Sequence, residues 1–91
     1  MNEYRELVEL GYQLQEVAQK RVSAQAQVRK WASMAAEART PEDEKRCNKN
    51  ADSHAAKARA LCEQEGELSR KWDELNTRLK RVWRESKRAA H

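Results

Sequence analysis

The stretch RTPEDE, residues 39–44, decides the fold because it separates two long segments that both have helical periodicity. Thr40 is a good N-cap, Pro41 suits the first position of a helix, and the three acids that follow place negative charge in the first turn. Proline disfavours helical backbone at the residue before it, so the preceding helix should end near Arg39. The sequence therefore predicts a helical corner at about residues 39–41.

The segments on the two sides of the corner predict one helix over about residues 3–39 and a second over about residues 41–90. Both show the heptad repeat of a coiled coil. The seam predicted for the first helix comprises Leu7, Leu10, Leu14, Val17, Arg21, Ala24, Val28, Trp31, Ala35 and Ala38. The seam predicted for the second comprises Glu44, Cys47, Ala51, His54, Ala58, Leu61, Glu65, Leu68, Trp72, Leu75, Leu79 and Val82.

Two glycines interrupt this pattern. Gly11 could mark a close approach of the two helices, since a glycine in a helix interior costs about 1 kcal/mol against alanine. A break at Gly66 would divide the second helix and give a three-helix bundle, which is the alternative to a hairpin.

Folding the second helix back about the corner also predicts a register. Facing residue numbers should sum to about 82, so that each a position meets a d position across the seam. Trp31 then faces Ala51, and the two seam charges, Arg21 and Glu65, lie in adjacent layers where they can pair diagonally. Such a pair adds little net stability but selects one register among several.

Composition supports an all-α fold. Charged residues make up 37% of the 91 residues, with two glycines, one proline and no phenylalanine, which is typical of long helices. Disorder is the alternative for so charged a chain, but the net charge is only +4 and the apolar residues are periodic. We therefore predict a single domain: a long antiparallel two-helix hairpin, or coiled coil. So small a core favours pairing into a homodimeric four-helix bundle.

Location is predicted from what the sequence lacks. No apolar run approaches the roughly 20 residues that span a bilayer, and the polar N-terminus does not resemble a signal peptide. Cys47 and Cys62 would lie about 22 Å apart along one helix, too far for a disulfide. We expect a cytoplasmic protein without membrane contact.

A second strip of small or apolar residues lies beside the predicted seam. It could simply widen the packing within the hairpin. The alternative is a docking face for a second copy or for another protein's helix. Its candidate residues are Tyr4, Val8, Gly11, Ala18, Val22, Cys62 and Ser69.

Positive charge gathers at the C-terminal end, where residues 77–91 contain six bases against one acid. The register leaves about the last ten residues without a partner on the first helix. The candidate partner-binding residues there are Arg81, Trp83, Arg84, Lys87 and Arg88. They could merely complement the helix dipole and cover the end of the bundle. They could also contact an acidic protein surface, or bind nucleic acid through residues 78–88.

Catalytic and metal chemistry is not expected. Cys47, His54 and Cys62 follow one another at spacings of seven and eight residues, so they are too far apart along a helix for one zinc ion. No glycine-rich phosphate loop or nucleophile–base set is present, so no catalytic residue or cofactor is predicted. The sequence predicts a non-enzymatic helical interaction protein that binds a partner protein as an adaptor, regulator or inhibitor. The alternative is a nucleic-acid-binding hairpin that uses the basic end.

Overall fold

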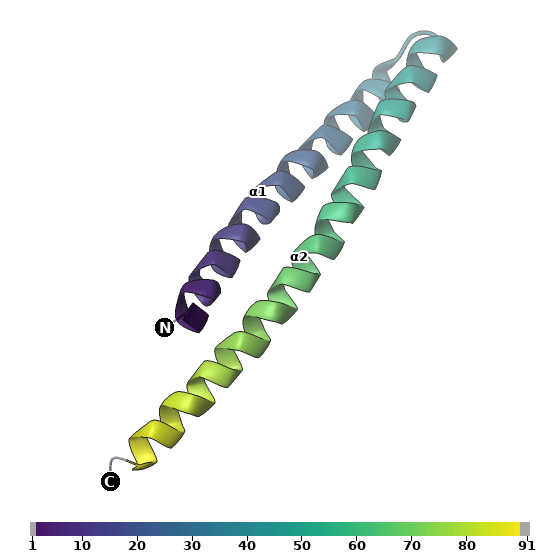
Figure 1. Cartoon of the computed structure of the whole chain (residues 1–91). Coiled ribbons are helices and arrows are strands. Elements are labelled where there is room, and N and C mark those ends of the chain that lie inside the picture. Colours follow the sequence, from purple (N-terminus) through teal and green to yellow (C-terminus); the bar gives the residue numbers. More distant parts are fainter. Residues whose placement is uncertain (1, 90–91) are drawn as a thin grey trace.

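The computed structural model describes residues 2–89 and contains two helices, α1 (Asn2–Glu37) and α2 (Pro41–Ala89). They pack along each other as an antiparallel hairpin, and no strand occurs among the described residues (Figure 1). The predicted all-helical hairpin is therefore confirmed. The molecule is a thin rod with extents of 75 × 15 × 14 Å.

The corner forms because Thr40 caps α2. Its hydroxyl oxygen accepts a hydrogen bond from the Asp43 backbone N–H (3.2 Å), and its carbonyl accepts the first helical bond from the Glu44 N–H (3.1 Å). The Asp43 carboxylate accepts a bond from Arg46 at 3.0 Å, one turn further along the helix. The first turn of α2 is thus held by its own side chains.

The first helix ends earlier than its sequence predicts, at Glu37 rather than near Arg39. The Ala38 N–H bonds to the Ala35 carbonyl three residues back (3.3 Å), which tightens the last turn. Since Thr40 must leave helical geometry to cap α2, residues 38–40 make the connection. The predicted end of the second helix near residue 90 lies outside the described residues.

Burial follows the heptad repeat. All ten seam residues predicted for the first helix, and ten of the twelve predicted for the second, are buried or half-buried. The two exceptions, Glu44 and Val82, are exposed because they lie level with or beyond the two ends of α1. The most covered residues are Leu75 (4% exposed), Cys47 (5%), and Val17 and Ala24 (6% each). No large side chain of the described residues is fully buried, as expected of a core only two helices thick.

Across the seam, the Arg21 Nε donates a hydrogen bond to a Glu65 carboxylate oxygen at 2.5 Å, so the predicted diagonal pair forms. Arg21 also donates to the Gln25 side chain (3.1 Å). The hydrogen bond to Glu65, and then its negative charge, raise the pKa of the Arg21 guanidinium above its ordinary value. This pair ties together residues 44 positions apart and fixes how the two helices align.

Neither glycine breaks a helix or is required by a close approach of the helices. Helix α2 runs unbroken through Gly66, so the three-helix alternative is wrong. A Cβ built on Gly11 would lie 3.8 Å from the indole nitrogen of Trp72, an ordinary van der Waals distance, so the helices do not require a glycine there. Within the described residues, neither helix is long and apolar enough to cross a membrane.

Candidate interaction surfaces

The two long sides of the hairpin differ in charge. One side has two solvent-open hollows, the first between Glu6, Lys71 and Arg78 and the second between Lys20, Gln27 and Lys57. All six are g positions of the heptad, and they come from both helices, so the g strips of α1 and α2 share this side. The e strips must then share the opposite side.

The e strips contain no charged residue on either helix. We call this side the neutral face. It comprises Tyr4, Gly11, Ala18, Gln25 and Ala32 of α1 and Asn48, Ala55, Cys62, Ser69 and Asn76 of α2, with Val8 and Val22 at its border. All seven residues of the predicted docking face belong to it. Tyr4, Val8 and Val22 are 67%, 45% and 54% exposed. Cys62 and Ser69 are also exposed, whereas Gly11 and Ala18 are half-buried between the helices.

Sequence reasoning missed one contributor near this face. Tyr12 is 68% exposed and follows Tyr4 and Val8 at spacings of four residues, so the three side chains rise along one side of the first turns of α1. The four-residue spacing was the signal that could have revealed it. Tyr4, Val8 and Tyr12 thus form a row of exposed side chains at the start of α1.

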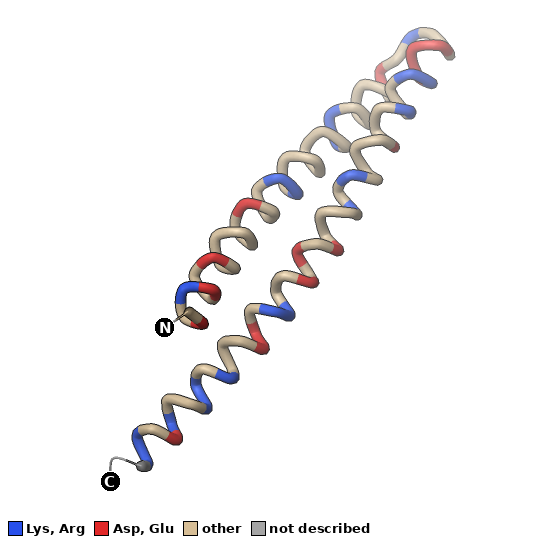
Figure 2. Tube along the Cα trace, viewed as in Figure 1, with Lys and Arg blue, Asp and Glu red and all other residues tan. Residues whose placement is uncertain are grey.

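The second surface is the end of α2. Helix α1 begins at Asn2, and α2 continues past that level to Ala89, as the free green-to-yellow end in Figure 1 shows. We call residues 80–89 the overhang. Figure 2 shows Lys and Arg spread along it with a single acid, Glu85. Ion pairs form at three places in residues 2–88, namely Lys20–Glu16, Arg21–Glu65 and Arg46–Asp43, and none involves a base of the overhang.

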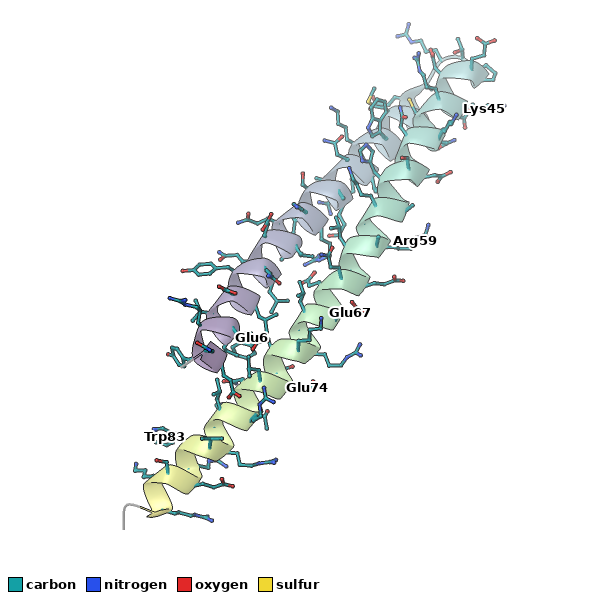
Figure 3. All side chains as sticks on the ribbon, in the orientation of Figure 1. Glu6, Lys45, Arg59, Glu67, Glu74 and Trp83 are labelled. Carbon is teal, nitrogen blue, oxygen red and sulfur yellow. The ribbon has the colours of Figure 1, made fainter. Side chains whose placement is uncertain are left out.

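Trp83 projects from the overhang beyond the first turn of α1 (Figure 3). It is 63% exposed, and its neighbour Val82 is 53% exposed. The Lys87 ammonium lies 4.8 Å from the centroid of the Trp83 ring, within the range of a cation–π contact. The other three predicted partner-binding residues, Arg81, Arg84 and Arg88, are also exposed and lie on the same two to three turns. The structure thus places all five on one free helical end.

The cysteines and His54 do not come together. Cys47 is buried in the seam, Cys62 is exposed on the neutral face, and both are free thiols. His54 is half-buried beside the hollow that Lys20 and Lys57 line. Among the described residues, no group of three His, Cys, Asp or Glu side chains is placed to hold a metal ion.

Comparisons of the chain with protein-family models, with curated proteins and with solved structures gave no match.

Proposed function

We propose that this chain is a non-enzymatic helical interaction protein that binds a partner protein as an adaptor, regulator or inhibitor. We further propose that it acts as a homodimer in which two coiled-coil hairpins pair into a four-helix bundle. Its two free thiols suit a reducing compartment, and we assign it to the cytoplasm.

The observation that supports this proposal best is the excess of exposed surface. The chain exposes 7641 Å². A compact monomer of its mass, 10.6 kDa, would expose about 5,500 Å². The rod therefore leaves about 2,000 Å² per chain that a globular fold would cover. Interfaces of obligate homodimers bury about 2,000–5,000 Å² in total, or half of that per chain, so the excess is large enough to form one.

The neutral face is the side best suited to a second copy. Charged residues must lose their hydration when an interface forms, whereas small uncharged ones pack closely at little cost. The opposite side would have to desolvate charged residues, namely Glu6, Lys20, Lys57, Lys71 and Arg78. A second hairpin on the neutral face would also cover the half-buried leucines of the seam from one side.

The test is the mass in solution, by sedimentation equilibrium over a range of concentrations. We expect a dimer of about twice the monomer mass. Val22→Glu should weaken dimerisation by about 100-fold or more, because symmetry buries the new charge twice. Gln13→Glu adds the same charge on the g side and should leave the dimer intact. Equal behaviour of the two variants would contradict the choice of face.

Partner binding is tested by affinity capture from the native host with nuclease-treated and untreated arms. We expect a protein that is captured in both arms and lost when Trp83 and the overhang bases are replaced by alanine. Capture that depends on nucleic acid and falls steeply with salt would instead favour the nucleic-acid alternative, which the unpaired bases of the overhang also suit.

A further inference from the structure

We propose that the overhang binds an acidic amphipathic helix of the partner protein, laid along α2 in continuation of α1. This inference rests on the proposed function and names the chemistry of the partner. It follows from the shape of the hairpin end, from the pattern of its charges and from the way its helix is supported.

The seam of α2 continues past the start of α1. Leu79 is half-buried at the last level that α1 covers, and Val82, the next seam residue, is 53% exposed. Trp83 stands beside it and is 63% exposed. From Cys47 to Leu75, the seam positions of α2 are buried or half-buried against α1. A helix placed in line with α1 would cover these three apolar residues in the same way.

Bases border this uncovered apolar line on one edge. At 100° per residue, Lys80 and Lys87 lie along the edge beside Trp83, whereas the edge beside Val82 holds Arg78 and, within the overhang, the acid Glu85. The position of Lys87 over the Trp83 ring shows that these flanking side chains reach the apolar line. A helix that approaches here meets Lys80 and Lys87 on one flank and an excess of bases over the overhang as a whole, so an acidic helix suits it best.

The hairpin already contains a helix of this chemistry at the neighbouring position. The first turns of α1 contain Glu3, Glu6 and Glu9, with leucines at the seam. Glu6 borders the same hollow as Lys71 and Arg78 of α2. Over its last covered turns, α2 thus packs against a helix with three acids and one base, Arg5. An acidic helix on the overhang would extend this arrangement.

The hairpin also holds the overhang in helical form before a partner binds. A free peptide of about ten residues would be mostly unfolded in water, because helices shorter than about 12–15 residues are marginal. Here the overhang is the continuation of a 49-residue helix whose earlier turns are packed against α1. The partner therefore binds a helix that is already ordered, and the entropic cost of ordering it is reduced.

Other occupants fit less well. The overhang of a second copy would bring the same excess of bases, so that like charges would face each other. Nucleic acid or an anionic membrane would use the bases, but phosphate backbone has no need of an aliphatic seam residue such as Val82. These occupants serve as the contrary outcomes of the test.

The probe is a fluorescently labelled synthetic peptide of about three heptads, with leucine at the seam positions and glutamate on the flanks. Its binding to the full chain is measured by fluorescence anisotropy, beside a matched peptide with lysine in place of glutamate. We expect saturable binding of the acidic peptide only. Trp83→Ala should weaken it by about ten-fold or more. The pair Lys80→Gln and Lys87→Gln should weaken it most at low salt and less as salt rises, whereas Lys45→Gln with Lys49→Gln, at the corner, should have no effect at any salt concentration.

Three results would overturn the inference. These are no saturable binding of the acidic peptide, equal binding of the lysine peptide, and equal or tighter binding of a single-stranded oligonucleotide or of anionic lipid vesicles. Circular dichroism of each variant checks that the hairpin is intact, which we expect since these positions are exposed. A chain that dimerises and captures a host protein, yet ignores the acidic peptide, would refute this inference and leave the proposed function standing. A chain that captures no protein would refute both.

Discussion

Replacing Leu75 by alanine tests whether the two-helix seam is the core of this protein. Leu75 is the most covered residue of the core, at 4% exposed. It lies in the half of the hairpin away from the corner, which we call the open half and in which the seam is rich in leucine. Removing a buried leucine side chain costs about 2–5 kcal/mol, and the upper part of that range reflects the empty cavity left behind.

The structure places Leu75 beside a solvent-open hollow that Leu10, Glu6 and Arg78 also line. Water can enter the space that the shorter side chain leaves, so the cavity term should be small. We therefore expect a loss at the lower end, about 2 kcal/mol, which corresponds to a fall in melting temperature of about 8–16 °C. Urea unfolding followed by far-ultraviolet circular dichroism measures it. The measurement is repeated at several protein concentrations, because dimerisation would add to the apparent stability.

Leu79→Ala is the matched control. It removes the same atoms from the next seam position, but Leu79 is only half-buried, so the loss should be about half as large. A loss at Leu79 equal to that at Leu75, or a loss at Leu75 below about 0.5 kcal/mol, would refute the view that burial along this seam holds the hairpin together. A loss near 5 kcal/mol would show that the site is dry.

Three further tests address the corner, the seam charges and the exposed face of α2. Thr40→Ala removes the acceptor of the Asp43 N–H and should cost about 1 kcal/mol in urea unfolding. Replacing Arg21 by glutamate should lower the stability of the hairpin. Adding Glu65→Arg should restore part of that loss, because the pair re-forms with its charges exchanged. A double variant no more stable than the single variants would contradict the pairing. Gly66→Ala meets no atom within 4 Å and should raise the stability by about 0.5–1 kcal/mol, seen as a higher melting temperature.

The sequence predicted the hairpin because its signals are local or periodic. A capping threonine followed by proline marks the corner within a few residues, and a heptad repeat identifies the buried side of each helix without reference to the other. The pairing of Arg21 with Glu65 was also predictable, because once the corner is placed the register leaves these two seam charges in adjacent layers.

What the sequence could not give depends on distances and exposure. The last turn of α1 tightens through the hydrogen bond from the Ala38 N–H to the Ala35 carbonyl. Several local geometries are nearly equal in energy at a helix end, so the sequence does not determine the last residue of the helix. From the sequence, Gly11 could mark a close approach. A Cβ built there would lie 3.8 Å from the indole nitrogen of Trp72, which leaves room for a methyl group, and only the separation of the helices reveals this. The candidate surfaces were predicted as sets of residues, and the absence of charge from the whole neutral face became evident once both helices were aligned.

The distribution of burial also bears on where a second copy should sit. The small seam residues Ala24, Ala35, Cys47, Ala51 and Ala58, which lie in the half near the corner, are buried by two helices alone. In the open half, only the two largest covered residues, Val17 and Leu75, reach that level, and the other leucines and the Trp72 ring remain half-buried. Two helices bury these alanines readily, but of the larger seam residues in the open half they bury only Val17 and Leu75, so the uncovered apolar area grows toward the open end. The same end holds the exposed Tyr4, Val8 and Tyr12 and leads into the overhang. Both proposed contacts therefore draw on the half of the hairpin where apolar surface is least covered.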